Sequence, residues 1–363
     1  PDANIIRMGI GDVAGPLCPV VRDALVTGAA EQGVKDTFHG YGPEQGYAFL
    51  RDAISAYYAR NGVSVDAADI FISDGAKSDT GNISELFHND NVILIPDPVY
   101  PVYVDSNIMN GKKVTYLSGN AENNFLPMPD PSVHADIIYL CSPNNPTGAI
   151  MEREDLEKIA EIILEKDLFV ISDEIYSELT YAKEDHVSIA SLPGMKERTV
   201  LINGFSKAFA MTGWRLGYAC APEVILKQML KIHQFAIMCA PTTSQYAAVE
   251  ALRNGDEDVQ HMRESYDQRR RFLLNAFREM GIDCFEPLGA FYTFPNISRF
   301  GMTSEEFATK LLMEEKVAVV PGTAFGACGE GFVRISYAYS LKSLKEALSR
   351  IERFVKRHDG KAE

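Results

Sequence analysis

Residues 199–221 read TVLINGFSKAFAMTGWRLGYACA and contain the pattern that decides the fold. The run TVLIN (199–203) is a strand candidate, and RLGYACA (215–221) is a second one, separated from it by a turn rich in small residues. Further strand candidates upstream are IFIS (70–73), NVILI (91–95), KVTYL (113–117), DIIYLC (136–141) and LFVIS (168–172). Several of these runs are apolar on both faces, which is typical of strands in a parallel sheet covered by helices on both sides.

Helical patterns separate these strand candidates. Residues 154–166 place Leu156, Ile159, Ala160 and Ile163 on one stripe, as an amphipathic helix does. Alternating strands and helices predict an α/β fold with a mostly parallel sheet.

The last hundred residues follow another pattern. A long helix at 257–280 leads into the short runs FYTF, VAVV and FVRIS, and a closing helix is expected at about 341–357. We therefore predict a large domain over 31–257 and a smaller α+β domain formed by 1–30 and 258–363.

Composition excludes several classes of function. The 35 basic and 50 acidic residues give a formal net charge of −15, which argues against nucleic acid or an anionic membrane as the main partner. No apolar run approaches the ~18–20 residues of a membrane helix, and no signal-peptide pattern opens the chain. Six scattered cysteines, without a CxxC pair or histidines at zinc-ligand spacing, indicate reduced thiols in a cytoplasmic protein without a metal site.

One motif is a false lead. GIGDVA (9–14) fits the GxGxxA fingerprint of dinucleotide binding, which requires a full strand before it and a helix after it. Only eight residues precede Gly9, and Pro16 and Pro19 follow, so we reject nicotinamide binding.

The strongest chemical signal is Lys207, directly after an apolar strand in a turn of small residues. An amine in that place suits Schiff-base formation better than a surface charge. Arg215 follows eight residues later and is suited to bind a phosphate. SPNNPTG (142–148) and SDEIY (172–176) also follow strands directly, at the edge where open α/β sheets bind ligands.

Four motifs together resemble one family. NNPTG (144–148), DEIY (173–176), FSKxxxxxGWRxG (205–217) and FVRISYA (332–338) occur in the order and with the rough spacing of the class I aminotransferases. The resemblance covers nearly the whole chain. It implies the fold of the fold type I transferases and the cofactor pyridoxal 5′-phosphate (PLP).

The resemblance also implies residue roles at the cofactor ring. Lys207 would form the Schiff base with PLP and later move the substrate proton, and Asp173 would keep the pyridine nitrogen protonated. Tyr176 and Asn145 would hydrogen-bond the phenolic oxygen, and Tyr100 would stack on the ring. Taken singly, Asp173 is also compatible with a helix N-cap and Tyr100 with a core aromatic.

Two further groups would bind anions. Gly75, Ala76 and Lys77 form a strand-to-helix turn that would bind the phosphate together with Arg215 and Ser206. Many relatives have a serine three residues before the lysine, where this chain has Gly204, so one phosphate hydrogen bond is expected to be missing. Arg334 would bind the substrate α-carboxylate with two parallel hydrogen bonds, although a structural salt bridge is the simpler alternative.

The two halves of the chain resemble different branches. Residues 4–148, with FISDGAKSDTGNI among other segments, resemble LL-diaminopimelate aminotransferase. Residues 150–358, with SDEIYSELTY and MCAPTTSQYAA, resemble the aspartate and aromatic aminotransferases. A mosaic, natural or engineered, with a junction near Gly148–Met151 is the hypothesis that follows.

The first half implies the leading substrate. In GYGPEQG (40–46), Glu44 would reach across a homodimer to the distal amine of LL-diaminopimelate, and Tyr41 would contact the neighbour's PLP phosphate. Lys77 would bind the distal carboxylate. The expected reaction is therefore amino transfer from LL-diaminopimelate to 2-oxoglutarate, a step of lysine biosynthesis. Alternatives are an aspartate or aromatic aminotransferase, a C–S β-lyase of the same fold, and a catalytically silent binding module.

Overall fold

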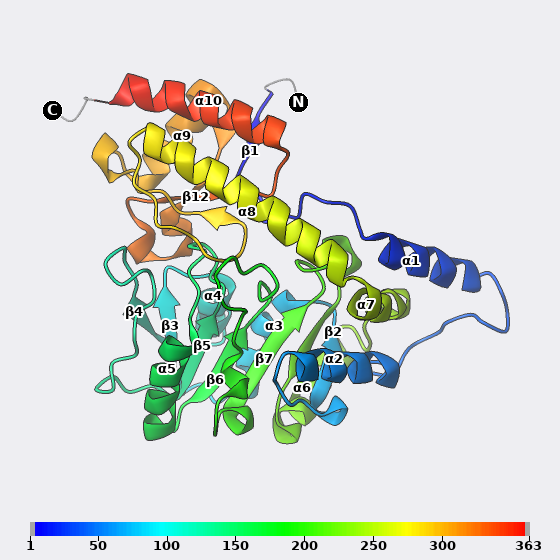
Figure 1. Ribbon diagram of the computed structural model, residues 1–363. Coiled ribbons are helices and arrows are strands. Elements are labelled where there is room, and N and C mark those ends of the chain that lie inside the picture. The colour runs from blue at the N-terminus through cyan, green and yellow to red at the C-terminus, as the bar shows by residue number, and fades with distance from the viewer. Residues whose placement is uncertain (1–3, 360–363) are drawn as a thin grey trace.

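A seven-stranded sheet forms the centre of the larger unit in the computed structural model, which describes residues 4–359 (Figure 1). Its strand order is β2-β8-β7-β6-β5-β3-β4. The strands are β2 (Ile70–Ser73), β3 (Val92–Asp97), β4 (Lys113–Ser118), β5 (Ile137–Cys141), β6 (Phe169–Asp173), β7 (Thr199–Gly204) and β8 (Gly217–Cys220). Neighbouring strands are parallel except at β8, which runs antiparallel to both β2 and β7. The α/β fold with a mostly parallel sheet is therefore confirmed.

Helices cover both faces of this sheet. They are α2 (Ala48–Arg60), α3 (Ala76–Asn82), α4 (Val102–Met109), α5 (Arg153–Lys166), α6 (Glu223–Ala236) and α7 (Thr242–Asn254). Strand β3 shows why both faces are apolar: Ile93 and Ile95 pack in one core cluster, and Leu94 packs in another beneath α5. Successive side chains of a strand point to opposite faces, so a strand buried on both sides needs a continuous apolar run.

The smaller unit contains the end of the chain. It includes α8 (Asp256–Glu279), β9 (Tyr292–Thr293), α9 (Ser304–Glu315), β10 (Val317–Ala318), β11 (Val320–Pro321), β12 (Val333–Ser336) and α10 (Leu341–His358). The run 317–320, expected as one strand, forms two. β10 pairs with β1 (Ile6–Arg7), whereas β11 pairs with β12, so the chain changes partners at Val319.

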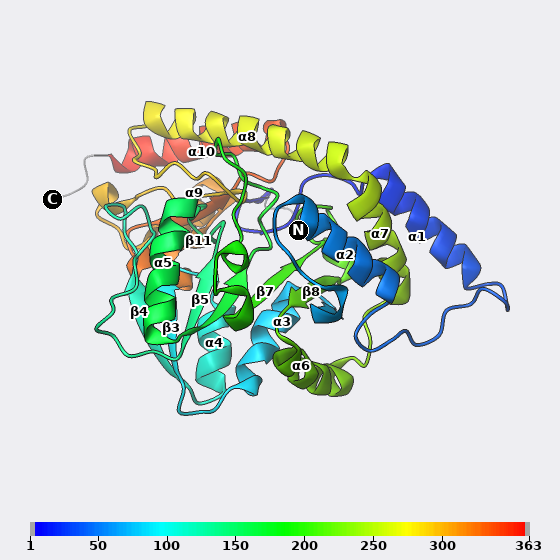
Figure 2. The same ribbon diagram turned by 60° about the horizontal axis from the view of Figure 1, so that its bottom comes forward.

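Residues 4–30, which were predicted to belong to the smaller domain, contact both units. β1 lies beside β10, but α1 (Pro19–Glu31) packs along α7 of the larger unit (Figure 2). Val21 and Leu25 of α1 are buried in the core cluster that also contains α2. Apart from this difference, the domain boundaries near residues 31 and 257 remain a prediction.

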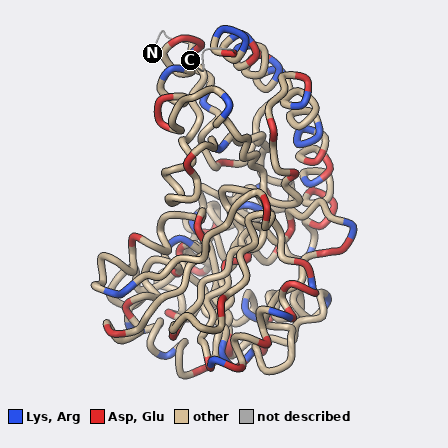
Figure 3. The backbone as a smooth tube through the Cα atoms, turned by 90° about the vertical axis from the view of Figure 1, so that its left-hand side faces the viewer, with Lys and Arg blue, Asp and Glu red and all other residues tan. Residues whose placement is uncertain are grey.

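Short 3-10 turns complete the described secondary structure, and they lie at 67–69, 83–86, 189–191, 196–198, 212–214, 298–300, 322–325 and 327–329. Basic and acidic residues are interspersed along both units (Figure 3). Within residues 4–359, no helix is long and apolar enough to cross a membrane. No group of three or more His, Cys, Asp or Glu side chains in that range could hold a metal ion, and all six cysteines are free.

Candidate active site

A cavity of about 610 Å³ lies at the carboxyl ends of the parallel strands, where the smaller unit meets the sheet. Most of the predicted site residues line it: Ala76, Lys77, Tyr100, Asn145, Asp173, Tyr176, Ser206, Lys207, Arg215 and Arg334. They come from five separate turns of the larger unit and from β12 of the smaller one. The fold therefore brings together side chains that are up to about 260 positions apart in sequence, as open α/β sheets do at this edge.

Lys207 lies just after β7, with its side chain inside the cavity. Its Nζ donates a hydrogen bond to the carbonyl oxygen of Gly11. Burial lowers the pKa of Lys207 to about 8, against the opposing attraction of Asp12. An amine with this pKa is partly neutral near physiological pH, and a neutral amine is the form that attacks a carbonyl or accepts a proton.

Asp173 is the last residue of β6, and its carboxylate is fixed by two donors. Tyr103 donates from Oη to Oδ2 at 2.6 Å, and the backbone N–H of Ile175 donates to Oδ1 at 3.0 Å. Burial raises the pKa of Asp173 to about 6, so the group is mainly ionised at neutral pH. It thus contributes a negative charge to the lining of the cavity.

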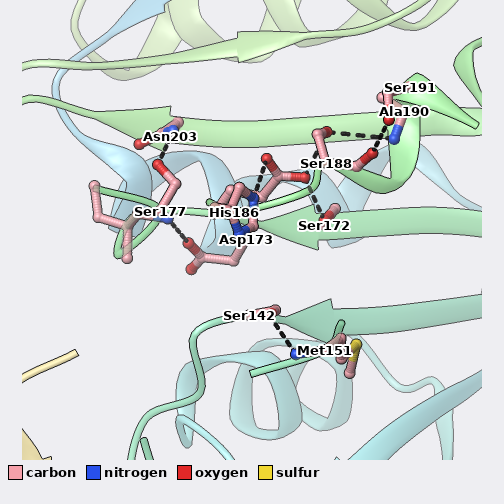
Figure 4. A network of polar contacts seen from close by, with 12 residues as sticks. Ser142, Met151, Ser172, Asp173, Ser177, His186, Ser188, Ala190, Ser191 and Asn203 are labelled. Atoms are coloured by element: carbon pink, nitrogen blue, oxygen red, sulfur yellow. Dashed lines mark hydrogen bonds and ion pairs between the residues drawn. The ribbon is translucent and has the colours of Figure 1, made fainter. Parts of the chain in front are cut away.

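The neighbouring acid, Glu174, does not line this cavity and belongs to a separate network with Ser172, His186 and Ser188, which are labelled in Figure 4. Its carboxylate accepts hydrogen bonds from Ser172 at 3.1 Å and Ser188 at 2.8 Å, and it pairs with His186 at 3.0 Å. It lines a second cavity of about 520 Å³. We assign the chemistry to the first cavity because Lys207 and Asp173 face it.

Arg334 is buried, and its hydrogen bonds go to neutral oxygens. Nη1 donates to Asn145 Oδ1 and Nη2 donates to the carbonyl oxygen of Gly9, both at 2.7 Å. Nε is buried without a hydrogen-bond partner in the described part of the chain. No carboxylate of residues 4–359 pairs with Arg334, so within these residues Arg334 does not form the structural salt bridge that was the simpler alternative. A buried cation with a free donor suits an incoming carboxylate.

Two glycines keep the turn before α3 open beside Arg215. Gly75 has a φ of +127°, and a Cβ on it would lie 2.5 Å from Arg215 Nη2. A Cβ on Gly217 would lie 2.5 Å from the backbone nitrogen of Ala76. Gly75 itself does not line the cavity, although Ala76 and Lys77 do. The guanidinium thus lies against bare backbone, next to the N-terminus of α3, which suits a phosphate.

The glycine at position 204, where many relatives have a serine, has a steric explanation. A Cβ there would lie 3.0 Å from both the Cα of Gly217 and the carbonyl oxygen of Leu216. A serine would therefore require β7 and β8 to separate slightly. Ser206 lines the cavity and remains available for the phosphate.

The glycine motif GIGDVA (9–14), rejected above as a nicotinamide site, contributes to the cavity: Ile10, Gly11 and Asp12 line it. The carbonyl oxygens of Gly9 and Gly11 accept from Arg334 and Lys207. A Cβ on Gly9 would lie 2.8 Å from Val320 Cγ2, and one on Gly11 would collide with the hydroxyl of Tyr292. The glycines are needed for this close approach, which the sequence pattern alone did not indicate.

Sequence reasoning missed several further lining residues: Asp12, Tyr103 and Tyr292. Tyr103 lies one helical turn beyond Tyr100, and Tyr292 lies in the predicted strand FYTF. Only their position in three dimensions identifies them as part of the site.

Tyr41 and Glu44 do not line the cavity of their own chain. Tyr41 is 84% exposed, and Glu44 accepts a hydrogen bond from Gln234 at 2.5 Å. Any role at an active site would therefore require a partner subunit.

Together, the donor set fits PLP. The glycine-lined turn with Arg215 suits its phosphate, Asp173 suits its pyridine nitrogen, and Lys207 suits its aldehyde.

Comparison with known proteins gives a consistent result. The family model described as aminotransferase class I and II matches residues 3–351. The putative aminotransferase YugH of Bacillus subtilis (strain 168) is 42% identical over 97% of this chain and 92% of its own length. An LL-diaminopimelate aminotransferase of Parabacteroides distasonis is 36% identical over 98% of this chain and 92% of its own.

Among solved structures, an aromatic aminotransferase from Pyrococcus horikoshii OT3 superposes with a TM-score of 0.92. It shares 38% identity and covers 98% of this chain and 96% of its own. These relatives of both branches thus align over nearly the whole length of the chain, and none of the three matches is confined to one side of Gly148–Met151. The mosaic origin stays a hypothesis.

Proposed function

The chain belongs to the class I and II aminotransferases, and from that premise we propose that it transfers the amino group of LL-diaminopimelate to 2-oxoglutarate. That it is a PLP-dependent aminotransferase follows from the family. The observation that carries the assignment of residues is the meeting of Lys207, Asp173 and Arg334 in one cavity. A silent binding module would have no need of these three groups together.

When bound, PLP supplies an aldehyde and an electron-withdrawing ring that stabilises negative charge at the substrate Cα. Lys207 holds and moves the Cα proton, and its pKa of about 8 allows both protonation states near neutral pH. Asp173 holds the proton of the ring nitrogen through its negative charge. Arg334, oriented by Asn145, binds the α-carboxylate, and the backbone carbonyls of Gly9 and Gly11 hold Arg334 and Lys207 in place.

The substrate assignment depends on groups beyond this common set. Lys77 lines the cavity, and in this proposal it binds the distal carboxylate. The resemblance of residues 4–148 adds Glu44 of the partner subunit for the distal amine. The resemblance of residues 150–358, together with the aromatic aminotransferase among the structural relatives, favours an aspartate or aromatic donor as the second candidate. No observation specifically favours the C–S β-lyase.

Glu44→Gln tests the substrate assignment. A charge that pairs with the distal amine in a desolvated site is lost, so kcat/KM for LL-diaminopimelate should fall at least about tenfold. Glutamate has no distal amine, and its kcat/KM should stay within about twofold. Asp36→Asn, which removes an exposed carboxylate of the same loop, is the matched control. Equal losses for both donors would assign Glu44 a structural role.

Exposed aromatic residues favour a homodimer. Phe38 (62%) and Tyr41 (84%) of the loop before α2 are exposed, as is Phe235 (95%) of α6. The Glu44–Gln234 hydrogen bond joins this loop to α6. Large apolar side chains gathered on a surface mark a protein interface. We propose that a second copy of the chain covers them and receives Tyr41 at its phosphate.

Tyr41→Phe is accordingly expected to weaken PLP retention about 10- to 100-fold, or ~1.5–3 kcal/mol for a hydrogen bond to a charged group. Cofactor release during dialysis measures this effect, and sedimentation measures the assembly. Full activity in a sedimenting monomer would contradict both the dimer and the shared site.

A further inference from the structure

Tyr292 lies between two of the site residues and contacts both. It is 1% exposed and sits in β9, opposite Ser336 of the antiparallel strand β12. Arg334, two residues before Ser336, lies on the same face of the sheet as Tyr292. The Arg334 Cζ lies 4.3 Å from the centroid of the Tyr292 ring and 4.6 Å from that of Phe325. The two rings therefore hold the guanidinium in place.

The hydroxyl of Tyr292 points to the other site residue. Its Oη lies 2.9 Å from Tyr176 Oη, a buried hydrogen bond in which either phenol can donate. Gly11 covers this hydroxyl so closely that a Cβ on it would collide with Tyr292 Oη. No other hydrogen bond to Tyr292 Oη occurs within residues 4–359.

Counting protons decides the direction of this hydrogen bond. Each phenol has a single proton and can also accept. If Tyr176 donates to Tyr292, its proton is no longer available to the cavity. If Tyr292 donates to Tyr176, the proton of Tyr176 remains free for an acceptor there. The phenolic oxygen of PLP is such an acceptor, so cofactor binding selects the second arrangement.

We propose that Tyr292 is a positioning residue: its hydroxyl donates to Tyr176 and directs the Tyr176 proton to the cofactor's phenolic oxygen, while its ring supports Arg334. The inference rests on the proposed function, in which Tyr176 bonds that oxygen. A donor chain of this kind also polarises the terminal hydroxyl. Tyr292 thus links the carboxylate-binding arginine to the group that tunes the cofactor.

The test follows the visible absorbance of the bound cofactor during a pH titration. A donor to the phenolic oxygen stabilises its negative charge and lowers the pKa of the bound cofactor. Tyr292→Phe should therefore raise the titration midpoint by about 0.5–1 unit, the effect of one net hydrogen bond. Tyr176→Phe should raise it further. Because Tyr292 acts through Tyr176, the double variant should titrate like Tyr176→Phe alone.

The KM for the amino acid tests whether the ring of Tyr292 supports Arg334. Tyr292→Phe keeps the ring against Arg334 and should leave KM for the amino acid within about twofold. Tyr292→Leu should raise KM about tenfold through the lost cation–π contact. Tyr337→Phe is the matched control: it removes another buried hydroxyl, bonded to the carbonyl oxygen of Ala290 at 3.1 Å, and should leave midpoint and KM unchanged.

The outcomes separate the inference from the proposed function. If Tyr176→Phe shifts the midpoint and Tyr292→Phe does not, the inference is wrong and the role of Tyr176 stands. If Tyr292→Phe causes the same shift with and without Tyr176, its effect is not transmitted through Tyr176, and the inference is again wrong. If Tyr176→Phe causes no shift, the Tyr176 assignment fails and the inference fails with it. Should Tyr292→Phe fold poorly, Gly11→Ala, which displaces the same hydroxyl, is expected to raise the midpoint only when Tyr176 is present.

Discussion

Lys207→Ala is expected to abolish transamination and to leave PLP bound without a covalent link. Lys207 and Lys77 are the lysines that line the cavity among residues 4–359, and burial lowers the pKa of Lys207, so the variant loses the group that moves the Cα proton. General acid–base catalysis alone contributes about 10²–10⁴-fold, and loss of the covalent link adds to that. Borohydride reduction followed by peptide mapping should label Lys207 in the wild type and nothing in the variant.

Lys77→Ala is the matched comparison, since Lys77 lines the same cavity. It should keep the borohydride label at Lys207 and lose mainly affinity for the substrate or the phosphate. A labelled peptide containing Lys77 in the wild type would contradict the assignment of Lys207.

Asp173→Asn is expected to lower kcat by about 10²–10³-fold, the cost of removing one preorganised and buried charge. The amide keeps the size of the side chain. Its oxygen can accept from the Ile175 N–H while its NH2 group donates to the Tyr103 hydroxyl, so the loss should fall on turnover rather than on folding. Steady-state kinetics and thermal unfolding of the same samples measure the two effects.

Glu174→Gln, at the next residue, is the control for the effect of Asp173→Asn on kcat. This acid faces the Ser172, Ser188 and His186 network and does not line the cofactor cavity. Its loss should lower the thermal stability and leave kcat within a few-fold of the wild type. A larger loss of kcat for Glu174→Gln than for Asp173→Asn would contradict the placement of the catalytic charge.

The sequence was sufficient for the sheet and for the residues that follow its strands. Continuous apolar runs such as DIIYLC and TVLIN can be buried only between two helical layers, so they indicated strands and their order along the chain. Polar motifs directly after such runs must meet at the carboxyl edge, which placed Asn145, Asp173 and Lys207 together.

Contacts between distant segments were beyond this reasoning. Nothing local distinguishes the Gly9–Gly11 segment from a loop, because its glycines are required only by the approach of Val320 and Tyr292. Likewise α1 packs on α7 through Val21 and Leu25, an apolar pair that would fit either unit equally well. The division of 317–320 into two strands depends on which partner strand lies beside each half.

The role of Tyr292 also depends on contacts between distant segments and could not be predicted from the sequence. Its ring and its hydroxyl serve two different residues, Arg334 and Tyr176, and these lie 158 positions apart in sequence. A tyrosine in a short apolar strand gives no sign of either contact. Only the register of β9 against β12 brings them to one side chain.

The central claim is amino transfer from LL-diaminopimelate to 2-oxoglutarate. Its most direct test is kcat/KM of the purified protein for LL-diaminopimelate, aspartate and phenylalanine as donors, with glutamate formation as the readout. We predict glutamate from all productive donors and the highest kcat/KM for LL-diaminopimelate. A higher kcat/KM for aspartate or phenylalanine would contradict the substrate assignment, and no glutamate from any amino acid would contradict amino transfer to 2-oxoglutarate.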